Sequence, residues 1–169
     1  MSVTTPKTHA IVRPPWQVAA MVEDTCTQFS VPMERQPYMN VDGEWRLDDW
    51  YVQQRANQGF EEWLALNAPY AIGDRLVVRI REGDKRPEEI FFTVTSISAG
   101  RVQDVTDAQA IAEGVDPHQD VGGFDPELPL ASEAHAEQWD ADHDNPEHKW
   151  SANPWVWICE FEKASPCLK

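Results

Sequence analysis

The chain has 169 residues, of which 41% are apolar, and its formal net charge at neutral pH is −15. This size suits one globular domain, and no run of residues approaches the ~18 apolar residues that a membrane span needs. The first residues lack the apolar region of a secretory signal, and the three cysteines form no CxxC pair, so we expect a cytoplasmic protein with reduced thiols and no membrane partner.

The N-terminal part predicts short elements separated by prolines and glycines. A first strand is expected over His9–Arg13, and apolar residues at helical spacing predict a helix over Trp16–Glu23. The stretch 29–47 is expected to be irregular, with a short strand or a hairpin near Asp42-Gly43. A second helix is expected over Asn57–Leu66, where aromatic and apolar residues again recur at helical spacing.

A β-hairpin is predicted in the middle of the chain. Apolar residues at 76, 78 and 80 alternate with polar neighbours, which predicts a half-buried strand over Arg75–Arg81. A turn over Glu82–Lys85 leads to a return strand over Ile90–Ser98, rich in β-branched and aromatic residues. The pair Ala99-Gly100 then predicts another turn, into the segment Arg101–Val105.

A short helix is predicted next, over Asp107–Glu113. Thr106 and Gln109 have the spacing of a capping box, in which each side chain accepts a hydrogen bond from the backbone of the other. Gly114 stands where many helices end in a left-handed residue. Local sequence therefore defines both ends of this helix.

Most of the net negative charge lies in one segment. Residues 104–148 contain 13 Asp or Glu and no Lys or Arg, whereas the rest of the chain has 16 acidic and 14 basic residues. Because proteins bind duplex DNA through Lys and Arg that neutralise phosphates, duplex DNA is an improbable partner. The prolines and glycines of residues 115–148 predict a long acidic loop, with one helical turn near Ser132–Trp139. Its Asp and His residues lack the spacing of a calcium or zinc site, so no metal and no cofactor is expected.

The last predicted strand, Trp155–Glu162, is apolar on both faces over most of its length, as in a closed barrel. We therefore predict an α+β fold, a β-barrel of about five or six strands with two or three short helices. The predicted organisation is a single domain over 9–162, which contains the acidic insertion at about 115–148, between tails at 1–8 and 163–169.

Three segments resemble the ASCH-domain proteins, members of the PUA-like superfamily that are common in bacteriophages and prophages. The segments occur in the family's order, cover about half of the chain, and are Tyr70–Arg79, Val94–Val115 and Asn153–Glu162. The resemblance implies a PUA-like barrel in the cytosol of a bacterial host. It also implies recognition of a nucleoside or of single-stranded RNA, since the family resembles RNA-binding barrels.

Some ASCH proteins are amidohydrolases that act on acylated cytidine-type nucleosides, and the resemblance implies Glu113 as the catalytic residue if this chain is an enzyme. The family's Gly-Arg-Lys-Thr-x-Thr motif falls at residues 23–29, where only Thr25, Thr27 and Gln28 keep part of it. No Lys lies between Lys7 and Lys85, so we expect the hydrolase activity to be lost unless Lys7 or an Arg supplies the charge.

Three functions remain open: a recognition protein, an amidohydrolase, and an acidic protein that imitates a polyanion in the basic groove of a host protein. Candidate ligand-binding residues are the motif remnants, the acidic residue of the later helix and two aromatic residues that can stack on a base: Thr25, Thr27, Gln28, Glu113, Trp50 and Tyr51. Candidate contacts to a basic partner are Asp116, Asp120, Asp125, Glu127, Asp140, Asp142 and Asp144. Cys26 has acidic neighbours and is expected to be an unreactive buried thiol.

Overall fold

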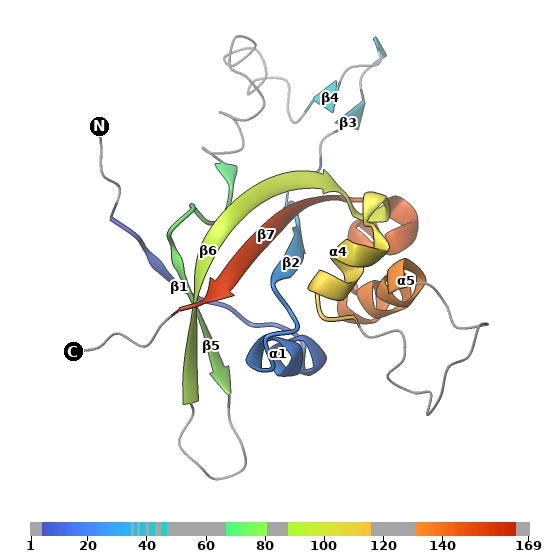
Figure 1. Ribbon diagram of the computed structural model, residues 1–169. Helices are drawn as coiled ribbons and strands as arrows, with labels where there is room; N and C mark the ends of the chain where they lie inside the picture. The colour runs from blue at the N-terminus through green and yellow to red at the C-terminus, as the bar shows by residue number, and fades with distance from the viewer. Residues whose placement is uncertain are drawn as a thin grey trace, which may run out of the picture.

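A computed structural model describes residues 5–34, 36, 38–39, 41–42, 45–46, 67–80, 88–115 and 131–164 (Figure 1). In these residues five strands form one mixed sheet, in the order β1-β5-β6-β7-β2, accompanied by three α-helices, which confirms the predicted α+β class. The strands of the sheet are β1 (Thr8–Ala10), β2 (Gln28–Pro32), β5 (Arg75–Ile80), β6 (Glu88–Arg101) and β7 (Trp155–Lys163). The helices are α1 (Pro15–Val22), α4 (Asp107–Ala112) and α5 (Ala131–Asp142).

The strands predicted from alternation lie at the centre of the sheet. β5 and β6 pair antiparallel, with Leu76 opposite Phe92, and β6 pairs antiparallel with β7. β1 adds to β5 in parallel, and β2 adds to β7 antiparallel. Of the strand or hairpin expected near Asp42, the structure has the hairpin, as the antiparallel pair β3 (Tyr38–Met39) and β4 (Trp45–Arg46).

The sheet is open, so the prediction of a closed barrel is wrong. β1 and β2 are its two edges and do not pair with each other in the described part of the chain. β7 is apolar on both faces because a different cluster covers each face. Cys159 and Phe161 belong to the core beneath α1, whereas Val156 and Ile158 pack with Trp139 of α5. Helices on two sides therefore produce the burial that barrel closure was expected to produce.

β6 is longer than predicted, and Ala99-Gly100 is not a turn. These two residues pair with Trp157 and Val156 of β7, and the chain turns only at the 3-10 segment Val102–Asp104. A register shift between Val94 and Ser96 marks a bulge, which bends a strand and increases its twist. Figure 1 shows the curved far half of β6 running toward α4 and α5.

Two further predictions are corrected. The stretch expected to be irregular contains β2, in which Pro32 is tolerated as the last residue of an edge strand. The acidic segment contains α5, a helix of 12 residues where one turn was expected. The predicted helix at 57–66 and the turn at 82–85 lie outside the described residues.

The main core lies between α1 and the sheet. Met21 of α1 packs with Phe29 of β2 and with Phe92 and Phe161 of the central strands. Asp74 connects the segment before β1 to the start of β5. Its carboxylate accepts hydrogen bonds from the backbone N–H groups of Lys7, at 2.9 Å, and Ala71, at 3.0 Å. None of the helices described here is long and apolar enough to cross a membrane.

Candidate functional site

Glu113 follows α4 directly, and the ends of this short helix determine its position. The predicted capping box is present: the Thr106 side chain accepts from the backbone N–H of Gln109, and the Gln109 side chain accepts from that of Thr106. Gly114 then takes a φ of +93°, and a Cβ at this position would lie 2.8 Å from the Cβ of Ala20. The close contact with α1 requires glycine at position 114 and leaves the preceding Glu113 buried.

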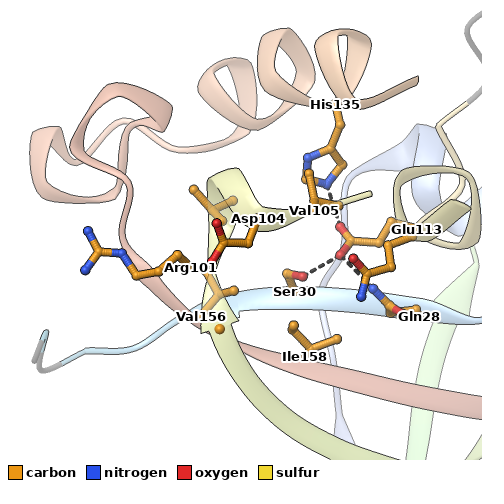
Figure 2. A pocket seen from close by; sticks show the side chains of 12 residues that line it. Gln28, Ser30, Arg101, Asp104, Val105, Glu113, His135, Val156 and Ile158 are labelled. Atoms are coloured by element: carbon orange, nitrogen blue, oxygen red, sulfur yellow. Dashed lines mark hydrogen bonds and ion pairs between the residues drawn. The ribbon is translucent and has the colours of Figure 1, made fainter. Parts of the chain in front are cut away.

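Glu113 is only 3% exposed, and its carboxylate contacts three hydrogen-bond donors inside the protein. Its Oε1 atom accepts from the Ser30 hydroxyl and, at 3.3 Å, from the side-chain amide of Gln28. Its Oε2 atom lies 2.6 Å from Nε2 of His135 (Figure 2). Donors from β2 and from α5 therefore meet at a carboxylate held by α4, which offsets the loss of its hydration.

The His135 ring contacts the carboxylate of Glu113 and the rings of Trp139 and Trp150. His135 is 3% exposed, and its ring lies edge-on to Trp150, with centroids 5.8 Å apart. In the neutral imidazole the ring hydrogen is assigned to Nε2, because this nitrogen faces a carboxylate, and Nδ1 is then the nitrogen without a hydrogen. Nδ1 is buried and has no hydrogen-bond partner in the described part of the protein.

These side chains form the polar end of a pocket of about 100 Å³. Val102, Val105, Val156 and Ile158 contribute apolar surface to its walls. Arg101 and Asp104 also line it, and Figure 2 shows the Arg101 side chain extending away from Glu113. The pocket therefore combines apolar walls with a buried carboxylate, amide, hydroxyl and imidazole, a composition typical of small-molecule sites.

Arg13 supplies a positive charge that acts on Glu113. Its Nε donates to Gln17 at 2.7 Å, and the Gln17 side chain donates to the backbone carbonyl of Glu113 at 2.9 Å. Burial lowers the pKa of Arg13, and the charges of Glu113 and other neighbours oppose this effect. An arginine with a lowered pKa still keeps its proton at neutral pH, so Arg13 can stabilise the carboxylate but cannot act as a base.

Two of the predicted ligand-binding residues, Glu113 and Gln28, line the pocket together. Thr25 and Thr27 are exposed and are not among its lining residues; the Thr25 hydroxyl donates to the backbone carbonyl of Ala20 at the end of α1. Trp50 and Tyr51 lie outside the described residues.

Ser30 and His135 also contact the carboxylate but were not predicted as site residues. Ser30 stands two residues after Gln28 on β2, so strand alternation could have placed both side chains on one face. His135 had no comparable signal, because its contact depends on how α5 packs against α4.

Two of the predicted partner-binding acids accept hydrogen bonds within the protein. Asp140 accepts from the backbone N–H of Trp150 at 2.6 Å, and Asp142 accepts from the indole of Trp16 at 3.1 Å. Asp144 is exposed, whereas Asp116, Asp120, Asp125 and Glu127 lie outside the described residues. No group of three or more potential metal ligands occurs in the ranges that the structure describes.

Cys26 and Cys159 are buried free thiols. Burial raises the pKa of Cys26 to about 12, and the nearby charge of Glu113 adds to this effect. The nucleophilic form of cysteine is the thiolate, which such a group does not reach at neutral pH. Cys26 is therefore a core residue.

Of three comparisons with known proteins, only the comparison with solved structures gave matches. No family model matches the sequence, and no curated protein matches it significantly. The chain is similar to the crystal structure of an ASCH domain from Lactobacillus crispatus, with 12% identity and a TM-score of 0.48 over 93% of this chain and 79% of the other. It is also similar to a protein from Enterococcus faecalis assigned to the DUF984 family, with 12% identity and a TM-score of 0.47 over 97% of this chain and 79% of the other.

Proposed function

We propose that the protein recognises a nucleoside, or an unstacked base of single-stranded RNA, in the pocket at Glu113, and that it does not hydrolyse this ligand. The observation that carries the proposal is the buried carboxylate of Glu113 at the polar end of a pocket with apolar walls. A base has a flat face and an edge of hydrogen-bonding groups. It therefore fits valine and isoleucine walls that end in a carboxylate, an amide and an imidazole.

The charge of the chain supports recognition of the base more than of the phosphate. With a net charge of −15 and 13 acids over residues 104–148, the protein repels a polyanion as a whole. Binding should therefore depend on contacts with the base and vary little with salt, because a steep salt dependence reflects the release of counterions from several neutralised phosphates.

The side chains around Glu113 support binding without hydrolysis. The lysine of the family motif has no counterpart at residues 23–29, and no lysine is among the described residues that line the pocket. Arg13 keeps its proton and Cys26 stays a thiol, so neither supplies the base or nucleophile that amide hydrolysis needs.

The first test measures nucleoside binding by titration calorimetry. We expect Glu113→Gln to weaken binding at least about tenfold, because a hydrogen bond to a buried charged group contributes about 1.5–3 kcal/mol. Asp144→Asn is the matched control, since it neutralises an exposed carboxylate that does not line the pocket. Equal losses in the two variants, or a steep fall of affinity with salt, would contradict the proposal.

The same samples test the amidohydrolase alternative. We expect no release of acid from N4-acylated cytidine, for lack of the motif lysine. Turnover by the unmodified protein that disappears in Glu113→Gln would establish the enzyme in place of the binding protein.

A second candidate function rests on the exposed acids of α5 and the residues that follow it. Glu137, Asp144 and Glu147 are exposed, and no Lys or Arg occurs between residues 104 and 148. We propose that this surface imitates a polyanion toward a basic host protein, as a phage or prophage product in the bacterial cytosol would. The buried free thiols Cys26 and Cys159 suit such a reducing compartment.

Neutralising this surface tests the second function. The triple variant Glu137→Gln, Asp144→Asn, Glu147→Gln should bind a basic host protein with a slower on-rate than the unmodified chain, because charge steers the encounter. We expect the unmodified chain to recover from bacterial lysate proteins that the triple variant does not recover. Duplex DNA should displace these proteins. Recovery of the same proteins by both forms at low and high salt would exclude the polyanion function.

A further inference from the structure

We infer that the outer edge of β1 is a docking site for an extended acidic peptide of another protein, which adds to the sheet as a further strand. This edge lies outside the pocket at Glu113 and is independent of the function proposed for that pocket. Four observations carry the inference: the direction of the backbone groups of β1, the way in which β1 is held, the side chains along its edge, and the charge around it.

The outer edge of β1 presents backbone groups with which no strand of the described residues pairs. β1 and β5 are parallel, and their hydrogen bonds use alternate residues of β1. The carbonyl of Lys7 accepts from the N–H of Arg75 at 2.7 Å, and the N–H of Ile11 donates to the carbonyl of Val77 at 3.0 Å. The alternate residues direct their N–H and C=O groups away from β5, and these are Thr8, Ala10 and Val12. Such an edge is a template to which an extended peptide can add.

β1 is held in place although it has only three residues. One oxygen of the buried Asp74 carboxylate accepts from the backbone N–H of Lys7 at 2.9 Å, and the other lies 2.8 Å from Nε2 of His9. Ile11, directly after β1, packs against the main core. A strand that is ordered before binding loses little conformational entropy when a peptide pairs with it, which favours association.

The side chains along this edge leave room for a neighbouring strand. Thr8 and Ala10 are small and exposed, and Val12 is 95% exposed. Threonine and valine also favour strand pairing. Prolines, which many edge strands use to prevent pairing, occur on both sides of this edge but not between residues 7 and 13. The edge can therefore pair over this whole stretch.

The charge around the edge favours an acidic partner. Residues 1–22 contain Lys7 and Arg13 but no Asp or Glu, and the neighbouring strand begins with the exposed Arg75. The nearby carboxylate of Asp74 is buried. Figure 1 shows β1 on the opposite side of the molecule from α5 and its acidic residues. A peptide with acidic side chains is therefore attracted to this edge and not repelled by the acidic segment.

The same charges disfavour pairing of β1 with β1 of a second copy. Such a pairing about a twofold axis is antiparallel and, if it is centred on Ala10, places Lys7 opposite Arg13. Like charges directly opposite each other on adjacent strands are destabilising. The net charge of −15 on each copy adds to the repulsion. A peptide of another protein is therefore the favoured occupant.

The test measures the binding of two labelled peptides by fluorescence anisotropy. Both are short and alternate valine with a charged residue, which is glutamate in one peptide and lysine in the other. We expect the unmodified protein to bind the glutamate peptide at least about tenfold more tightly at low salt. High salt should narrow this difference, because it screens exposed charges.

Variants at Ala10 test the contact with the backbone. Ala10→Pro removes an N–H that points away from β5, so β1 keeps its own pairing while the peptide loses a hydrogen bond. The affinity for the glutamate peptide should fall at least about tenfold. Ala10→Val is the matched control, because it keeps this N–H, and its affinity should stay within about twofold of that of the unmodified protein.

Lys7→Glu tests the charge without altering the backbone of β1. It should weaken binding of the glutamate peptide at least about fivefold and strengthen binding of the lysine peptide. Circular dichroism verifies that each variant is folded.

Each outcome of these measurements decides the inference. Equal binding of the two peptides, no binding of the glutamate peptide, or binding that neither Ala10→Pro nor Lys7→Glu weakens would overturn it. Sedimentation of the unmodified protein identifies the alternative occupant. Self-association that Ala10→Pro abolishes would assign the edge to a second copy and exclude the acidic peptide.

Discussion

Glu113→Ala is expected to lower the free energy of unfolding by about 3–5 kcal/mol, although the residue is charged and lies at a helix end. The substitution leaves Ser30, Gln28 and His135 without their shared acceptor inside the protein. Each buried donor that loses its partner costs about 1–3 kcal/mol, and the space left by the side chain adds to the loss. Urea unfolding followed by circular dichroism measures the difference.

Glu147→Ala is the control for this experiment, because Glu147 is an exposed acid whose side chain does not line the pocket. Its effect should stay within about 0.5 kcal/mol, as for most surface substitutions. A loss below about 1 kcal/mol for Glu113→Ala would mean that the carboxylate contributes little to the fold, contrary to its three contacts.

The second large effect is expected at Phe29, which is fully buried at the meeting point of β2, β7 and the segment before α1. Its ring lies 5.7 Å from that of Phe161, and the guanidinium of Arg13 lies 4.9 Å from its centroid. Phe29→Ala should lower the free energy of unfolding by about 3–5 kcal/mol, since it leaves a cavity in the core and removes a contact of a buried cation.

Phe91 gives a matched control of the same residue type. It is 37% exposed on β6, so Phe91→Ala should cost about 1 kcal/mol or less. Chemical denaturation of both variants, with the slope of the transition compared, checks that the unfolded states are alike. Similar losses at the two positions would contradict the placement of Phe29 in the core.

The parts of the fold that sequence predicted are those with strong local signals. Alternation at Leu76 and Val78 located β5, and the capping box with Gly114 located α4. α5 was underestimated because its buried face consists of Ala131, His135 and Trp139, four residues apart, which gives a weak apolar pattern in an acidic segment. The sequence of β7 does not reveal whether the sheet closes. A strand covered by other elements on both faces and a strand inside a closed barrel have the same pattern of apolar residues.

The residues of the site also fall into those that the sequence predicted and those that it did not. Glu113 and Gln28 were predicted from motif positions, and the structure places both at one pocket. Ser30 lies 83 residues from Glu113 along the chain, and His135 lies 22 residues from it. Contacts of this kind depend on the packing of β2, α4 and α5, and no local pattern of residue types encodes them.

The pocket is built from three separate segments of the chain, so a ligand that binds in it stabilises the folded protein by mass action. β2, α4 and α5 bring their side chains to Glu113 only when the chain is folded, so a ligand held there binds the native state and not the unfolded one. At a free concentration of about 100 Kd, such a ligand raises the free energy of unfolding by about 2.7 kcal/mol. The melting temperature of the protein is consequently a reporter of its own ligand, and a collection of nucleosides can be screened by heating alone, without a label or an assay of activity.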